Sequence, residues 1–282
     1  MTDSKTPTTT LAVRASIPEL LQAFGEDELS IQALFRFCYL PAGRLSFLKE
    51  LAAEEVWGAR DFALLKYLAV HIHLSIAQGR FVWNGDQLVV TAGALMTSNG
   101  APIYLGISPN AQPDGNPWVV NWVGERPSTP DLPAPADMGD WPVLDVGGEI
   151  VVALDFEHPE RRVHLGKLDE APVVTRMCAV AGAVSWALRH GLAARQIHSA
   201  GRGWFVPVYL GSRGDLLATP DFVAPLLPQT SREGTRYVVR SLLSAHSSYA
   251  PARAVVERCE LLPGWLLGAW EDAAEDAAEG VE

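Results

Sequence analysis

The densest cluster of residues able to do chemistry is the segment FEHPERRVHLG, Phe156 to Gly166. It gathers two glutamates, two histidines and two arginines around one proline, in a chain that otherwise spaces its charges thinly. His158, held by Glu157, suits proton transfer at neutral pH, and Arg162 suits stabilisation of charge on phosphoryl oxygens. Alternatively, Pro159 fixes a surface turn whose glutamates pair locally with arginines. Both interpretations stay open at this stage.

A second chemical signal is a long stretch without acidic residues. From Ala171 to Gly214, 44 residues, there is no Asp or Glu, although 33 acids in 282 residues would place about five there. This stretch and the residues after it carry arginine and no lysine: Arg176, Arg189, Arg195, Arg202, Arg213, Arg232, Arg236, Arg240, Arg253 and Arg258. Guanidinium groups suit bidentate recognition of phosphate or carboxylate, so the pattern predicts a positively charged surface in the second half of the chain. The alternative is that these arginines pair with acids from elsewhere, such as Asp155, Glu157 and Glu160.

Aromatic and metal-binding candidates are fewer. Trp204 and Trp141, flanked by glycines or acids, are the tryptophans placed to stack on a base, although most tryptophans are expected in the core. His71 and His73 lie two apart in a helical pattern, about 200° around the axis, so they cannot share one ion. No phosphate loop, dinucleotide fingerprint, nucleophile elbow or zinc spacing is present. The sequence therefore identifies no cofactor and no metal site.

The elements that must position these residues follow from periodicity. Residues 16–24 predict a helix started by Ser16, and helical patterns continue over 28–38 and 45–57. The strongest helical stripe runs over 61–79, and a second long helix is predicted over 171–191; each ends at a glycine. A last helix is predicted over 247–258.

Alternating patterns predict the strands. Residues 80–83 and 87–90 form a hairpin signal, with Asn84-Gly85 supplying the positive φ angles of a tight turn. Further strand patterns occupy 102–110, 117–125, 149–156, 203–211, 215–227 and 234–243. PIYLG at 102–106 and PVYLG at 207–211 each follow a long helix, which suggests that a helix-plus-antiparallel-sheet pattern occurs twice. Helices grouped with antiparallel hairpins define an α+β fold.

These patterns divide the chain into five segments. We expect a disordered N-terminus (1–15), an N-terminal helical and hairpin half (16–125), a Pro-rich strap (126–142), a C-terminal α+β half (143–268) and an acidic tail (269–282). The strap holds five of the chain's 20 prolines between Arg126 and Pro142.

Composition limits the class of protein. The chain is 48% apolar and 20% charged, as folded globular proteins are. Its net charge is −11, but the tail Glu271–Glu282 holds six acids and no base, so the rest of the chain carries −5. That charge argues against coating a duplex and permits one local basic groove. Three widely spaced cysteines predict reduced thiols and a cytoplasmic setting, and without a signal peptide or membrane span we expect a soluble protein with no membrane partner.

Several short motifs resemble a known family. They include TAGALMTSNGAPIYLGISPN, DLPAPADM, FEHPERR, FVPVYL and YAPARAVVERCELLPGWL, and in order and spacing they are similar to the uncharacterised family called domain of unknown function 3825, over residues 45–266. Members occur in bacteria and, in fungi, fused to RNA-binding modules, which implies an association with RNA or nucleotides. His158, Tyr209, Tyr249, Arg253 and Trp265 match residues of that family's motifs, so the resemblance implies that they belong to its functional site.

The chain also departs from that family's motifs. It has Thr91-Ala92-Gly93 for Asn-Thr-Gly, Ala250-Pro251 for two asparagines, and Val208 for a glutamine. Side-chain amides able to hydrogen-bond a base or ribose are thus lost in three places. The resemblance therefore implies a divergent member in which a ligand is bound without turnover.

On these grounds we expect a nucleotide- or RNA-associated protein whose arginines receive phosphate in a cleft between the two halves. A phosphodiester or nucleotide hydrolase using His158 and Glu157 is one alternative. A scaffold or regulatory protein that binds a partner through its acidic tail is another. The expected ligand-binding residues are Arg162, Arg202, Trp204, Tyr209, Tyr249 and Arg253.

Overall fold

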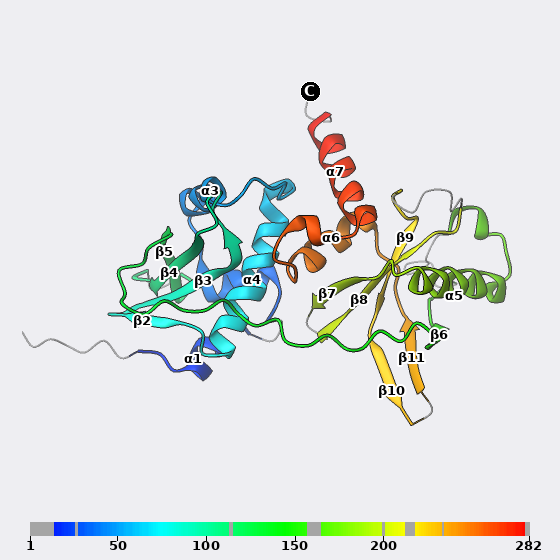
Figure 1. The fold of residues 1–282 in the computed structure, drawn as a ribbon, viewed down its shortest axis with the longest axis horizontal. Helices are drawn as coiled ribbons and strands as arrows, with labels where there is room; N and C mark the ends of the chain where they lie inside the picture. The colour runs from blue at the N-terminus through cyan, green and yellow to red at the C-terminus, as the bar shows by residue number, and fades with distance from the viewer. Residues whose placement is uncertain are drawn as a thin grey trace, which may run out of the picture. The chain divides into compact units, whose positions relative to one another are not determined.

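The protein has an α+β fold in which helices are grouped with mostly antiparallel sheets. The computed structural model describes residues 14–25, 28–112, 115–156, 165–198, 201–211, 218–232 and 234–279. Within these ranges the chain forms seven α-helices and eleven strands (Figure 1). No helix in these ranges combines the length and the apolar character needed to cross a membrane.

Internal contacts divide the chain into two compact units. Unit 1 comprises Met1–Glu28, Gln32–Glu54 and His71–Asp137, and unit 2 comprises Leu29–Ile31, Glu55–Val70 and Met138–Glu282. The division after Asp137 falls inside the Pro-rich segment 126–142, which carries neither helix nor strand.

Unit 1 is built on one five-stranded sheet. Its strand order is β1-β5-β4-β3-β2, from β1 (Cys38–Tyr39), β5 (Trp118–Gly124), β4 (Pro102–Pro109), β3 (Gln87–Met96) and β2 (Val82–Asn84). The helices are α1 (Ile17–Gln22), most of α2 (Ile31–Phe37), α3 (Ala42–Leu51) and the second half of α4 (Phe62–Ala77). Helix α1 begins as the sequence predicts, because the backbone N–H and hydroxyl of Ser16 both donate to Glu19 Oε2, at 2.7 and 2.8 Å.

The predicted hairpin is confirmed, but its turn is shifted by one residue. Strands β2 and β3 pair antiparallel, and Asn84 lies opposite Gln87, so the two-residue loop is Gly85-Asp86. Only Gly85 has a positive φ, +64°. Asn84 is instead held in the ladder, because cross-strand pairing outweighs its turn preference.

Unit 2 contains two three-stranded sheets. One has the order β7-β8-β9, from β7 (Ala194–His198), β8 (Gly201–Val208) and β9 (Phe222–Leu226). The other has the order β10-β11-β6, from β10 (Pro228–Ser231), β11 (Gly234–Val239) and β6 (Glu149–Val152). The helices are the first part of α4, up to Val70, then α5 (Val173–Arg189), α6 (Ala245–Arg253) and α7 (Gly264–Glu279), with short 3-10 turns at Ala59–Asp61, Gly166–Leu168 and Cys259–Leu261.

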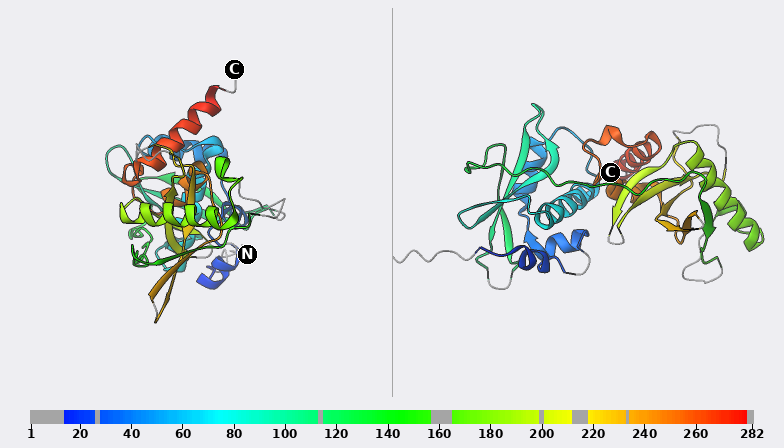
Figure 2. Two further views of the ribbon diagram at one scale, coloured as in Figure 1. Left: turned by 90° about the vertical axis from the view of Figure 1, so that its right-hand side faces the viewer. Right: turned by 60° about the horizontal axis from the view of Figure 1, so that its bottom comes forward.

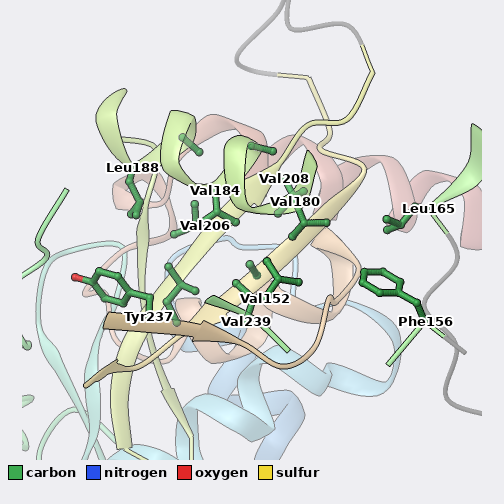
Figure 3. Close-up of a cluster of buried hydrophobic side chains, with 14 residues drawn as sticks. Val152, Phe156, Leu165, Val180, Val184, Leu188, Val206, Val208, Tyr237 and Val239 are labelled. Atoms are coloured by element: carbon green, nitrogen blue, oxygen red, sulfur yellow. The ribbon is translucent and has the colours of Figure 1, made fainter. Parts of the chain in front are cut away.

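Helix α5 covers the strands of unit 2 and builds its core, and the views in Figure 2 show it lying across them. Val180, Val184 and Leu188 follow at four-residue spacing and point from one face of α5 into this core (Figure 3). They meet valines and a tyrosine from the two sheets: Val152, Val206, Val208, Tyr237 and Val239. We call this set the core cluster; Phe156 and Leu165 close it at one end, and Leu188 lies at the other (Figure 3).

Several elements differ from the sequence prediction. The predicted helix over 45–57 ends at Leu51, because Ala52 pairs with Thr97 and the Ala53 N–H donates to the Met96 carbonyl at 3.0 Å. Strands β7 and β10 were not predicted. Two pairings, β1 with β5 and β6 with β11, are parallel rather than antiparallel. Each joins strands far apart in sequence, which hairpin signals cannot reveal.

Candidate functional site

Three residues that the sequence marks for chemistry lie outside the described part of the chain. Glu157, His158 and Arg162 fall between Phe156, where the description stops, and Leu165, where it resumes. The catalytic interpretation of that segment therefore stays a prediction. The candidate site residues that the structure describes are arginines and aromatic residues.

Among the described residues, Arg236 and Arg253 are paired with acids, although not with the acids proposed from sequence. Arg236 Nε donates to Glu149 Oε2 at 2.7 Å across the parallel pair β11–β6, and both side chains are more than half exposed. Arg253 donates from Nε and Nη2 to the two carboxylate oxygens of Glu55, at 2.5 and 2.8 Å. An exposed pair such as Arg236–Glu149 contributes little to stability, whereas the second pair is buried.

The Arg253–Glu55 pair lies inside an aromatic cluster of unit 2. The Arg253 side chain is 1% exposed and that of Glu55 is 8% exposed. The guanidinium carbon lies 4.9 Å from the centre of the Tyr67 ring and 5.3 Å from that of Trp57. Arg253 Nη1 also donates to the Val256 carbonyl at 2.9 Å, so every guanidinium nitrogen serves a protein acceptor. The expected ligand role of Arg253 gives way to a structural one, because no solvent ligand reaches this group.

Tyr249, another expected ligand residue, belongs to the same cluster. Its hydroxyl donates to Glu55 Oε1 at 3.3 Å, and its ring stacks on Trp270 with the centres 4.2 Å apart. Trp270 Nε1 donates to the Val56 carbonyl at 2.8 Å, and the Trp270 ring lies against Gly58. These contacts join α6 and α7 to the segment before α4. Tyr249 therefore holds unit 2 together from a buried position.

The protonation states in this cluster are fixed. Burial raises the pKa of the Tyr249 hydroxyl, and the charge of Glu55 raises that pKa further. Burial by itself acts to lower the pKa of Arg253, but the hydrogen bonds and charge of Glu55 outweigh it, and the net shift is upward. Tyr249 stays neutral and Arg253 stays charged at neutral pH, so the cluster is not suited to proton transfer.

Tyr209 occupies a packing position. It follows β8, is buried, and donates from its hydroxyl to the Ala218 carbonyl at 3.1 Å. Its ring meets Trp186 of α5 edge-on at 6.2 Å. Most of the side chain is therefore closed to a ligand.

Trp141 and Trp204 are joined by reciprocal hydrogen bonds. Trp141 Nε1 donates to the Gly203 carbonyl of β8, and Trp204 Nε1 donates to the Pro142 carbonyl, both at 3.2 Å. These bonds fix the end of the Pro-rich segment along β8. Both indoles are only half-buried, so part of each ring stays at the surface.

Two arginines gather at the Trp141 ring. The guanidinium carbons of Arg195 and Arg202 lie 5.3 and 5.6 Å from its centre, within cation–π range. Arg195 lies opposite Trp204 in the β7–β8 register, and Arg202 lies opposite Ile197. Alternation along the strands therefore places Arg195, Arg202 and Trp204 on one face of the sheet.

Neither of these guanidinium groups has an acidic partner among the described residues. No ion pair or hydrogen bond joins Arg195 or Arg202 to a carboxylate there, and Arg202 Nε is buried with no acceptor. Gly139, with a φ of +61°, permits the close approach of Arg202, because a Cβ there would lie 3.1 Å from Nη2. We call Trp141, Arg195, Arg202 and Trp204 the arginine–tryptophan patch.

Sequence reasoning singles out Arg202, Trp204 and Trp141, but leaves Arg195 as one of ten arginines. The placement of Arg195 depends on β7, which was not predicted. The signal that could have found it is Ser199-Ala200-Gly201, because a run of small residues between two alternating segments is typical of a hairpin turn.

Metal-binding groups are absent from the part of the chain that the structure describes, where no three His, Cys, Asp or Glu side chains lie close enough to hold an ion. His71 and His73 are buried on α4, and His73 Nε2 lies 3.2 Å from Glu28 Oε2. Burial lowers the pKa of His73, which the charge of Glu28 opposes.

Comparison of the chain with protein-family models, with curated proteins and with solved structures gives no match. Function therefore has to be inferred from the geometry of the arginine–tryptophan patch and from the sequence.

Proposed function

We propose that the protein binds nucleotides or single-stranded RNA through the arginine–tryptophan patch. The supporting observation is that Arg195 and Arg202 approach one indole ring while neither is bonded to a carboxylate in the described residues. Two positive charges at one ring, without a bonded carboxylate, raise the electrostatic free energy of the ligand-free protein, and an anion bound beside either of them lowers it. A phosphate matches the fork geometry of guanidinium donors.

The aromatic part of the patch favours a nucleic-acid ligand over a bare anion. Unpaired bases stack on aromatic rings and on guanidinium planes, and such stacking tolerates any base sequence. Trp141 and Trp204 supply the rings at the positions where the arginines supply the charge. The acidic body of the chain restricts this binding to one local surface, which suits a short single strand better than a duplex. The motif resemblance proposed from the sequence would imply the same ligand class.

Equilibrium binding to a fluorescently labelled ten-nucleotide uridine RNA, measured by anisotropy, tests this proposal. The variants Arg195→Met and Arg202→Met remove the charge but keep an apolar side chain on the indole. Each should weaken binding by about 1–3 kcal/mol, roughly 5- to 150-fold. For two phosphate contacts to a single strand, log K should fall against log salt with a slope of about −1.4, and the slope should approach zero in the double variant.

Arg189→Met is the matched control, because Arg189 is exposed at the end of α5 and outside the patch. If Arg195→Met and Arg202→Met bind the RNA as tightly as this control, the patch is not the binding site. If the wild-type protein binds neither the RNA nor a nucleotide at low salt, the proposal fails. Cleavage of the RNA that disappears in His158→Ala would instead favour the hydrolase alternative.

A further inference from the structure

A cavity in unit 2, outside the arginine–tryptophan patch, is lined by charges of both signs. It has a volume of about 600 Å³, within the range of small-molecule sites. Its charged lining residues are Asp145, Glu149 and Arg236. Glycine, serine, threonine and glutamine make up the rest of the described lining, so no apolar side chain is part of it. Recognition in this cavity therefore has to come from charges and hydrogen bonds.

Three neighbouring strands place polar side chains of this lining in one row. Gln229 of β10 pairs with Arg236 of β11, and Arg236 pairs with Glu149 of β6 (Figure 1). Residues paired across strands point to the same side of a sheet, and Tyr237, the next residue of β11, belongs to the core cluster. The row therefore faces away from the core cluster, and its two charged side chains are more than half exposed.

The ion pair in this row leaves hydrogen-bonding atoms of both partners available to a ligand. Arg236 donates to Glu149 Oε2 from Nε alone, at 2.7 Å. Among the described residues, no hydrogen bond engages Arg236 Nη1, Arg236 Nη2 or Glu149 Oε1. The two Nη groups can therefore donate to a carboxylate, and Glu149 Oε1 can accept from an ammonium group.

Asp145 adds a second carboxylate, which a glycine turn and a buried tyrosine hold in place. Asp145 Oδ1 accepts from the Gly147 N–H at 2.9 Å, and the Asp145 N–H donates to the Tyr237 hydroxyl at 2.8 Å. A Cβ at Gly148 would lie 2.7 Å from the Tyr237 ring and 3.1 Å from the Thr235 carbonyl oxygen, so only glycine lets the turn approach β11 this closely. Because Tyr237 is packed in the core cluster, the position of the Asp145 carboxylate is set before a ligand binds.

We infer that this cavity binds a short peptide through its two free termini. The C-terminal carboxylate of the peptide accepts from the Nη groups of Arg236, and its N-terminal ammonium group donates to Asp145 and Glu149. A simple anion would meet two carboxylates here and a simple cation would meet a guanidinium, whereas a zwitterion pairs each of its charges with the opposite one. A cavity of this volume suits a peptide of about three residues better than a single amino acid. This site is independent of the proposed RNA-binding patch.

Triglycine is the probe for this inference, and NMR titration of the full chain at neutral pH reports its binding. Millimolar triglycine should shift the backbone amide signals of the lining glycines Gly147, Gly148 and Gly234. Triglycinamide lacks the carboxylate and N-acetyltriglycine lacks the ammonium group, so each should bind at least about fivefold more weakly. Free glycine should also bind more weakly. The absence of a shift at tens of millimolar triglycine, or equal binding by glycine or by either blocked peptide, would overturn the inference.

Two variants that each remove one charge separate recognition of the two termini. Arg236→Gln should weaken triglycine binding at least about fivefold and leave triglycinamide binding unchanged, because that peptide has no carboxylate. Asp145→Asn keeps the oxygen that accepts from Gly147, and it should weaken the binding of triglycine but not that of N-acetyltriglycine. The thermal midpoint of Arg236→Gln should stay close to that of the wild-type protein, because an exposed ion pair contributes little to stability.

Arg240→Gln is the matched control, because Arg240 is exposed directly after β11 and does not line the cavity. This variant should bind triglycine as tightly as the wild-type protein does. Triglycine binding that neither Arg236→Gln nor Asp145→Asn weakens relative to this control would place the peptide elsewhere and overturn the inference. Equal weakening of triglycine and triglycinamide binding by Arg236→Gln would also overturn it, since the guanidinium would then not recognise the carboxylate.

Discussion

Replacing Arg253 by methionine should destabilise unit 2 severely. The change removes the bidentate partner of Glu55 and leaves a carboxylate that is 8% exposed without a counter-charge. Breaking a buried ion pair from one side costs about 3–5 kcal/mol. That is a large fraction of the roughly 5–15 kcal/mol by which a domain is stable. The cost comes from desolvating the remaining charge, since methionine fills much of the space that the arginine stem occupied.

The double variant is the decisive comparison. Glu55→Met combined with Arg253→Met replaces the pair by apolar side chains of similar length, and such replacements are often neutral or stabilising. The double variant should therefore recover most of the stability that either single variant loses. A modest residual loss is expected, because the Tyr249 hydroxyl no longer has its Glu55 acceptor, at 3.3 Å in the wild-type protein.

Urea unfolding followed by tryptophan fluorescence measures both effects. Trp57, Trp265 and Trp270 all lie in unit 2 and are buried, so they report its unfolding. Because the chain has two units, the transition of each should be fitted separately. A loss below about 1 kcal/mol in Arg253→Met, or a double variant as unstable as the worse single one, would refute the buried-pair reasoning. Weakened RNA binding by Arg253→Met without a stability loss would return Arg253 to the ligand site.

Three further outcomes follow from local features. Burial holds the pKa of His73 below its unfolded value of about 6.5, so the folded state binds fewer protons. The free energy of unfolding should therefore carry no penalty from His73 above pH 6.5 and should fall as the pH drops from 6.5 toward the lowered pKa. The urea midpoints of His73→Phe should lack this decline. Gly58→Ala should cost about 1–3 kcal/mol in urea unfolding, because its Cβ would lie 2.3 Å from Trp270 Cζ2 on a backbone with a φ of +73°; an unchanged midpoint would contradict this contact. Burial raises the pKa of Cys38 to about 12, so a maleimide at pH 8 should label the exposed Cys178 quickly and Cys38 only after unfolding, as mass spectrometry of the labelled peptides can check.

The sequence was sufficient wherever the deciding interactions are local. The long helices α4 and α5 appear where apolar residues recur at helical spacing, and Gly79 and Gly191 follow their ends with φ of +66° and +67°. The β2–β3 hairpin and the start of α1 at Ser16 are determined within a few residues. These elements were predictable because their hydrogen bonds and apolar spacing are set by neighbours in the chain.

Pairings between distant segments needed the tertiary structure. The parallel pairs β1–β5 and β6–β11 join strands that no turn connects, and α3 ends early because the chain beyond it pairs with the end of β3. Periodicity describes one segment at a time, so it contains no information on which other segment will supply its hydrogen bonds.

The same contrast between local and long-range interactions applies to single residues of the candidate site. The sequence indicated that the second half is rich in arginine and poor in acid, and it singled out Arg202, Trp204 and Trp141. It did not distinguish Arg253, which is neutralised by Glu55 198 residues away, from Arg202, which has no carboxylate partner among the described residues. Residue type fixes whether a side chain can carry charge. Whether that charge is free for a ligand depends on which distant acids the packed chain brings within about 4 Å of it, and only the tertiary structure decides that.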